Sequence, residues 1–154
     1  MTEAFEFPIQ RLAELEKTVA LVYDRFADRF PEDRDFWLRL RNEEYEHEAI
    51  LNNIQTLQQD VQVTTKSPSE FSDEVATMMI GKIQSLLDEA HRQELTRKEA
   101  LAIALQLEQS AGEFHFRCIC NSHQKQMDKY PQLWKNDFEH SARIRTHLEE
   151  TMHP

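Results

Sequence analysis

The sequence predicts an all-α protein, and three observations support this. The chain of 154 residues contains two glycines and five prolines, whereas a β-sheet protein of this size needs many turn residues. Strong helix formers such as Glu, Leu, Ala and Gln are abundant. Apolar residues recur at steps of three and four over long stretches, which is the period of an amphipathic helix. By its length, the chain should form one domain, residues 1–154, around one continuous core.

The first two predicted helices cover residues 9–30 and 33–59. Pro31 ends the first because proline cannot continue a helix, and Asp33 or Asp35 can cap the second. The short connection at Pro31 makes these helices antiparallel neighbours. Their apolar stripes comprise Leu12, Leu15, Val19, Val22, Tyr23 and Phe26 in the first helix, and Phe36, Leu40, Leu51 and Ile54 in the second.

Residues 60–95 are predicted to form a long connection that contains a helix. Ser67, Pro68 and Glu70 stand in the order of a capping box, and the best-defined helical pattern follows at 73–93. A bundle of two helical hairpins with one long crossover needs a connection able to travel its full length. This segment is long enough to do so.

The last two predicted helices cover residues 96–121 and 128–151. Thr96 and Glu99 form a second capping box, which opens the third long helix. Pro131 falls in the first turn of the fourth, where no intrahelical amide bond is required. The sequence therefore predicts four long helices in two antiparallel hairpins, joined by a helix-containing crossover.

Two short sequences place a carboxylate three residues before a histidine. These are Glu44 with His47, and Asp137 with His140. On a helix, residues i and i+3 project from the same face about one turn apart, so a carboxylate and an imidazole at this spacing can bind one ion together.

Each pair follows a glutamate on an apolar stripe at nearly the same distance. Glu16 lies 28 residues before Glu44, and Glu108 lies 29 residues before Asp137. If each half is a helical hairpin, the single glutamate on one helix lies beside the carboxylate-x-x-His pair on the other, at about the same level along the bundle. The predicted ligands, one or two from each of four helices, are Glu16, Glu44, His47, Glu108, Asp137 and His140.

These six positions face inward, and four buried carboxylates would repel each other. Two divalent cations would offset them, with the two imidazoles as neutral donors, so the pattern indicates a site for two metal ions. A ligand set rich in carboxylate and without thiolate favours iron first, with manganese or zinc as alternatives.

A simpler interpretation is a solvated helix face, because Glu-x-x-His arises easily in a chain with 28 acidic residues and seven histidines. The second copy at matched spacing favours the metal site. The neighbouring Glu43, Glu46 and Glu48 are expected to point outward as solvated charges.

The chain resembles the ferritin-like carboxylate proteins, and most closely the rubrerythrin family without its rubredoxin domain. Three features carry the resemblance: Glu16 followed seven residues later by Tyr23, the string NEEYEH at 42–47, and the run ALAIALQLE at 100–108. The resemblance implies a ferritin-like bundle that holds two iron ions with the six residues named above. It also implies that Tyr23 lies near the metals, where its hydroxyl orients a ligand carboxylate; an ordinary core tyrosine is the alternative.

Three positions depart from the family pattern. Asp137 replaces a glutamate and is one methylene shorter, which could weaken one metal position. Ala111 stands where typical members have a further glutamate ligand. His115 lies seven residues after Glu108, about 10.5 Å along the helix, so we expect it to support the site or the core rather than bind metal. The same argument applies to His147.

The resemblance implies a non-haem di-iron oxidoreductase that reduces peroxide or dioxygen. Electrons must come from a separate donor protein, because Cys118 and Cys120 do not form a rubredoxin-type pair. The resemblance also implies a homodimer. Two alternatives remain: an iron-binding or iron-handling protein with little turnover, and a metal-free helical module that binds protein partners.

The net charge of −10 opposes binding to nucleic acid or to an anionic membrane. The first ten residues lack the basic and apolar segments of a signal peptide, and the chain contains no run of 18 apolar residues. We therefore expect a soluble, cytoplasmic protein.

Overall fold

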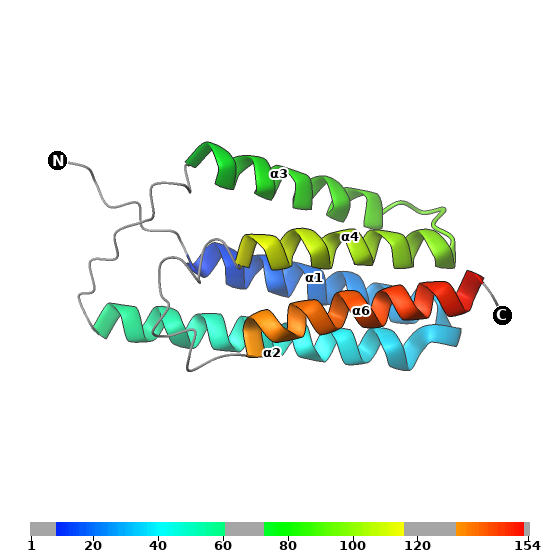
Figure 1. Cartoon of the computed structure of the whole chain (residues 1–154), viewed down its shortest axis with the longest axis horizontal. Helices are drawn as coiled ribbons and strands as arrows, with labels where there is room; N and C mark the ends of the chain where they lie inside the picture. The colour runs from blue at the N-terminus through cyan, green and yellow to red at the C-terminus, as the bar shows by residue number, and fades with distance from the viewer. Residues whose placement is uncertain (1–8, 61–72, 116–131, 153–154) are drawn as a thin grey trace.

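A computed structural model describes residues 9–60, 73–115 and 132–152, and over these ranges all of the secondary structure is helical (Figure 1). This confirms the predicted all-α class. The elements are α1 (Ile9–Arg29), the short 3-10 helix η1 (Pro31–Asp33), α2 (Arg34–Asp60), α3 (Asp73–Ala90), α4 (Arg97–His115) and α6 (Gln132–Met152).

The helices lie side by side along a common direction (Figure 1). α1 packs mainly on α2, and α4 packs on α6 and on α3. Within each of the pairs α1–α2 and α4–α6 the chain runs in opposite directions, and α3 carries it from the end where α2 finishes to the end where α4 begins. In chain order, α3 thus connects the two pairs.

Two of the predicted helix boundaries have the expected cause. Pro31 follows the end of α1 and opens η1. At the start of α4, the Thr96 hydroxyl oxygen accepts a hydrogen bond of 3.1 Å from the Glu99 amide, as in a capping box. The Glu99 carboxylate pairs with Arg92 at 3.3 Å.

The crossover helix ends at Ala90, three residues earlier than predicted. The chain then turns, and the carbonyl oxygens of Arg92 and Gln93 accept hydrogen bonds from the Arg29 side chain of α1. These bonds satisfy carbonyl groups beyond the end of the helix and attach the turn to α1. The predicted capping box at Ser67, the end of the third helix near 121, the start of the fourth near 128 and both cysteines lie outside the described residues.

The core contains an aromatic cluster between α1 and α2. Trp37, which lies outside the predicted apolar stripe, is completely buried, whereas Phe36, which belongs to that stripe, is only partly buried. The Trp37 ring lies 5.0 Å from Phe26, 5.1 Å from Phe36 and 5.6 Å from Tyr23, measured between ring centroids. Other fully buried core residues are Ala20, Ala27, Leu40, Leu51, Ala100, Leu101, Ala104, Leu107 and Ile144.

Asp33 forms a buried polar junction at one end of this core. Its carboxylate accepts hydrogen bonds of 2.5 and 2.6 Å from the Arg97 guanidinium and lies 2.7 Å from Nε2 of His147. His147 also stacks on Phe36, with ring centroids 4.1 Å apart. Asp33 thus joins η1 to α4 and α6.

Replacing Asp33 with asparagine should destabilise the protein at neutral pH by about 1–2 kcal/mol, because Arg97 and His147 lose a charged acceptor. Burial alone would raise the pKa of Asp33, but hydrogen bonds from Arg97 and His147 lower it below its usual value. A lowered folded-state pKa gives stability that is present above the unfolded pKa, near 4, and lost as the pH falls through the folded value. Urea unfolding at pH 7 and pH 3 should therefore show the difference from wild type shrinking in acid.

Asp88→Asn, at an exposed site on α3, is the matched control for this experiment. A destabilisation of Asp33→Asn that was equal at both pH values would contradict the ion-pair explanation.

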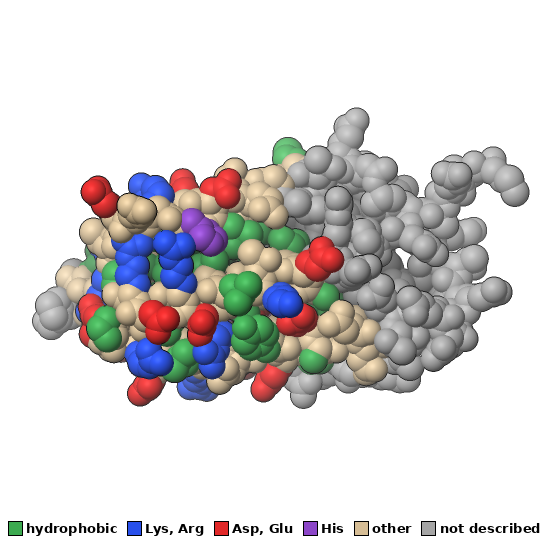
Figure 2. All heavy atoms as spheres, turned by 180° about the vertical axis from the view of Figure 1, so that it is seen from behind, with side chains coloured by type: hydrophobic (Ala, Val, Ile, Leu, Met, Phe, Trp, Pro, Cys, Tyr) green, Lys and Arg blue, Asp and Glu red, His purple; other side chains and the backbone are tan. Residues whose placement is uncertain are grey.

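Among the described residues, no helix combines the length and apolar composition needed to cross a membrane. The face seen in Figure 2 carries Lys and Arg side chains interspersed with Asp and Glu around hydrophobic patches. This face therefore carries charges of both signs.

Candidate metal centre

Four helices place five of the six predicted ligands at one buried location. α1 supplies Glu16, α2 supplies Glu44 and His47, α4 supplies Glu108 and α6 supplies His140. Their exposed fractions are 2%, 1%, 0%, 2% and 0%, respectively. Asp137 belongs to α6, but its side chain lies outside the described residues.

The ligand atoms form two groups, and within each group they lie within 4.8 Å of one another. One group is Glu16, Glu44 and His47, and the other is Glu44, Glu108 and His140. These buried Glu and His groups could hold metal ions. The imidazoles of His47 and His140 face each other across the centre, with ring centroids 5.4 Å apart.

Glu44 belongs to both groups through different oxygen atoms. Its Oε2 lies 3.6 Å from Nδ1 of His47, and its Oε1 lies 3.0 Å from Nδ1 of His140. Within each group, the second carboxylate lies farther from the imidazole than Glu44 does. Glu16 Oε2 is 4.0 Å from Nδ1 of His47, and Glu108 Oε2 is 3.3 Å from Nδ1 of His140. The Glu44 carboxylate therefore lies between the two groups, where it can bridge two ions.

Tyr23 supports the site from the core of α1. Its buried hydroxyl donates a hydrogen bond of 2.5 Å to Oε1 of Glu108. Burial and the negative charge of Glu108 raise the pKa of Tyr23 well above its ordinary value, so the hydroxyl keeps its proton. This bond leaves Glu108 Oε2 directed toward His140.

Protons bound by the site offset part of its negative charge. Burial disfavours the imidazolium form of His140, but the charge of Glu108 and hydrogen bonds with Glu108, Glu43 and Glu44 raise its pKa well above the usual value. Burial would raise the pKa of Glu44, yet hydrogen bonds from Glu16, His140 and His47 hold it well below its normal range.

Protons and metal ions can compensate the negative charge of this site at the same atoms. We expected the carboxylates to be tolerated only through two cations, with both imidazoles neutral. The carboxylates around His140 raise its pKa and so favour its imidazolium form, which adds a proton to the charge balance of the site. Metal ions and protons therefore compete for the same atoms.

Metal binding should accordingly release protons and should weaken as the pH falls from 8 to 6. A cation can bind Nδ1 of His140 only after the proton on that nitrogen has left. Calorimetric titration with Mn²⁺ in two buffers of different ionisation enthalpy measures this release, which we expect to be at least about one proton per chain. Binding that did not depend on pH or on the buffer would contradict this assignment of protons.

Glu43 is a site residue that the sequence analysis missed, because it was expected to be a solvated outer charge. Its side chain is 22% exposed, and Oε2 lies 3.0 Å from Nε2 of His140. Burial would raise the pKa of Glu43, but hydrogen bonds with His140 and Arg143 lower it to about 2. A usable signal was present, since Arg39 lies one helical turn before Glu43 and Arg143 lies one turn after His140.

The remaining positions singled out in the sequence divide into two classes. His147 contacts Asp33 and Phe36 at the end of the core, in agreement with a role outside the metal ligands. The side chains of Ala111 and His115, like that of Asp137, lie outside the described residues.

Comparisons of this chain with protein-family models, with curated proteins and with solved structures each gave no match. The site therefore has to be interpreted from its own geometry.

Proposed function

We propose that this protein is a non-haem di-iron oxidoreductase of rubrerythrin-like type, which reduces peroxide or dioxygen with electrons from a separate donor protein. One observation carries the proposal: buried Glu and His side chains from four helices form two ligand groups that share the Glu44 carboxylate. A shared carboxylate between two nitrogen-containing groups is the arrangement expected of a dinuclear centre.

The order and directions of the helices support a ferritin-like bundle. The pairs α1–α2 and α4–α6 correspond to its two hairpins, and α3 corresponds to the crossover (Figure 1). Di-metal proteins of this architecture draw single glutamates from two helices and carboxylate-x-x-His pairs from the other two. Glu16 and Glu108 take the first role, and Glu44 with His47 takes the second. On α6, His140 takes part of the second role, and Asp137 is the proposed carboxylate.

The donor set fits iron. Carboxylate oxygens and imidazole nitrogens, without thiolate, suit Fe²⁺ and Mn²⁺ better than a structural zinc ion. Two ferrous ions held here would supply the electrons that reduce peroxide or dioxygen.

The protein side chains provide placement and isolation. Nδ1 of His47 and Nδ1 of His140 each face a different oxygen of the shared Glu44 carboxylate. Tyr23 fixes the rotation of Glu108 by donating to one of its oxygens. Because these five ligands are at most 2% exposed, bulk water is excluded, which strengthens electrostatic interactions at the site.

Anaerobic loading with Fe²⁺ followed by a pulse of peroxide or oxygen tests this function. We expect two ferrous ions per chain to be oxidised faster than free Fe²⁺ under the same conditions, and to be re-reduced by an added electron donor. Optical absorption in the near ultraviolet follows both steps. An iron-loaded protein that oxidised no faster than free ferrous ion would refute catalysis.

The alternative is an iron-handling protein with little turnover, which the shorter Asp137 side chain would favour by weakening one position. Binding isotherms separate the two functions. One tight and one loose iron per chain, combined with slow oxidation, would indicate storage or transfer of iron.

A further inference from the structure

Glu43 connects the buried centre to the surface of the protein. It lies on α2 next to Glu44, and Oε2 of its partly exposed carboxylate is 3.0 Å from Nε2 of the fully buried His140. A carboxylate in this position differs from the proposed ligands because it contacts the opposite edge of the imidazole ring.

The two nitrogens of His140 face different partners. Nδ1 lies 3.0 Å from Glu44 and 3.3 Å from Glu108, within the ligand group, whereas Nε2 faces Glu43. An imidazole that binds a metal through one nitrogen usually donates the N–H of the other, and its partner fixes both the tautomer and the ring orientation. The contact with Glu43 therefore leaves Nδ1 as the atom available to an ion.

Glu43 is itself held in place by arginines from two helices. Arg143 of α6 donates a hydrogen bond of 2.5 Å to the oxygen that faces His140, and Nε of Arg39 lies 3.9 Å from the other oxygen. Two guanidinium groups favour the ionised carboxylate and restrict its movement. The carboxylate that faces Nε2 of His140 is thus held in place.

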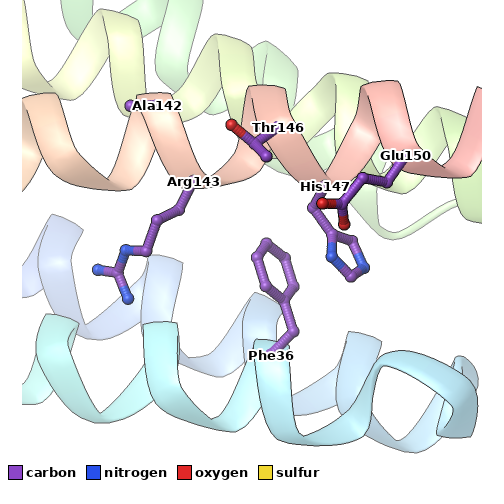
Figure 3. Close-up of a pocket in the computed structure, with 6 residues that line it drawn as sticks. All are labelled: Phe36, Ala142, Arg143, Thr146, His147 and Glu150. Carbon is purple, nitrogen blue, oxygen red and sulfur yellow. The ribbon is translucent and has the colours of Figure 1, made fainter.

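This chain of contacts reaches a surface pocket between α2 and α6. The pocket has a volume of about 320 Å³, and Arg143 lines it together with Phe36, Thr146 and His147 (Figure 3). The Arg143 side chain extends into the space between the two helices. Solvent in this pocket therefore contacts Arg143, which bonds to Glu43, which in turn contacts the buried His140.

We propose that Glu43, held by Arg143, is a positioning residue that orients His140 and strengthens Nδ1 as a donor to the metal on its side of the centre. The inference rests on the proposed metal centre. Glu43 is not a ligand, because its carboxylate contacts the nitrogen that points away from Glu44 and Glu108. Its loss should weaken the ion bound near His140 and leave the ion bound near His47.

The test is a titration of the full-length apo protein with Co²⁺, followed by optical absorption, for wild type and three variants. Glu43→Ala should lower the affinity of one ion by about 10- to 100-fold, the range found when an outer partner of a metal ligand is lost. Glu43→Gln should recover part of this affinity, because its amide oxygen still accepts the N–H. Glu46→Gln, an exposed change one turn along α2, is the control and should bind like wild type.

A second measurement separates positioning from a general structural effect. In ¹⁵N spectra of the Zn²⁺-loaded protein, His140 should carry its proton on Nε2, and this N–H should exchange faster with solvent in Glu43→Ala while the His47 signals stay in place. If Glu43→Ala does not fold, the same signals are read in Glu43→Gln, where a smaller change in the same direction is expected.

The outcomes are distinguishable. A wild-type protein that binds no metal overturns the proposed function itself. A wild-type protein with two ions, together with folded Glu43 variants that have unchanged affinities and an unchanged His140 N–H, overturns the positioning role alone. Loss of the ion near His47 would overturn it as well.

Discussion

Replacing Glu44 with glutamine should remove both metal ions from the protein. The two oxygens of this carboxylate serve different ligand groups, one at 3.6 Å from His47 and one at 3.0 Å from His140. A neutral amide offers a single acceptor oxygen and no charge, so neither group keeps its shared anion. We expect the affinity for each of the two ions to fall by more than about 100-fold. This is more than the loss expected when a residue that only hydrogen-bonds to a metal ligand is removed.

The two glutamates that belong to a single ligand group should behave differently from Glu44. Glu16→Gln should weaken mainly the ion near His47, and Glu108→Gln mainly the ion near His140, because each belongs to one group. Elemental analysis after equilibration with Mn²⁺ gives the occupancy of each variant, and Glu46→Gln should match wild type. Two tightly bound ions in Glu44→Gln would show that this carboxylate does not bridge the groups.

Replacing Trp37 with alanine should cause a large loss of stability, about 3–5 kcal/mol. The indole is fully buried and contacts Tyr23, Phe26 and Phe36, so its removal leaves a cavity in the middle of the aromatic cluster. Chemical denaturation monitored by circular dichroism measures the change. Because Tyr23 packs on Trp37 and donates to Glu108, we also expect weaker metal binding in this variant.

Trp37→Phe is the matched control and should cost much less. It keeps most of the apolar contact, and the indole Nε1 that it removes has no hydrogen-bond partner among the described residues. Equal losses for phenylalanine and alanine would indicate that the N–H, rather than the ring volume, stabilises the core.

The local features of this protein were predictable from its sequence because their causes are local. Pro31 has no amide hydrogen and ends α1, and the Thr96 hydroxyl caps α4 from three residues away. The inward positions of Glu16, Glu44 and Glu108 followed from the 3.6-residue period, because each lies on the same face as buried apolar neighbours.

The unpredicted features depend on pairs that are distant in the sequence. Glu43 was assigned to solvent because periodicity places it beside the stripe, yet Arg143, 100 residues later, draws it inward. The Asp33–Arg97 pair spans 64 residues. The charge state of His140 likewise depends on its distances to three carboxylates, which no spacing within one helix specifies.

Anomalous diffraction from crystals of the full-length protein grown with Mn²⁺ tests the central claim most directly. We expect two peaks per chain, about 3.5–4 Å apart, on either side of the Glu44 carboxylate and each in contact with Nδ1 of His47 or His140. Crystals grown in saturating Mn²⁺ that showed no peak at this carboxylate, with the acidic side chains still closed on His140, would contradict it.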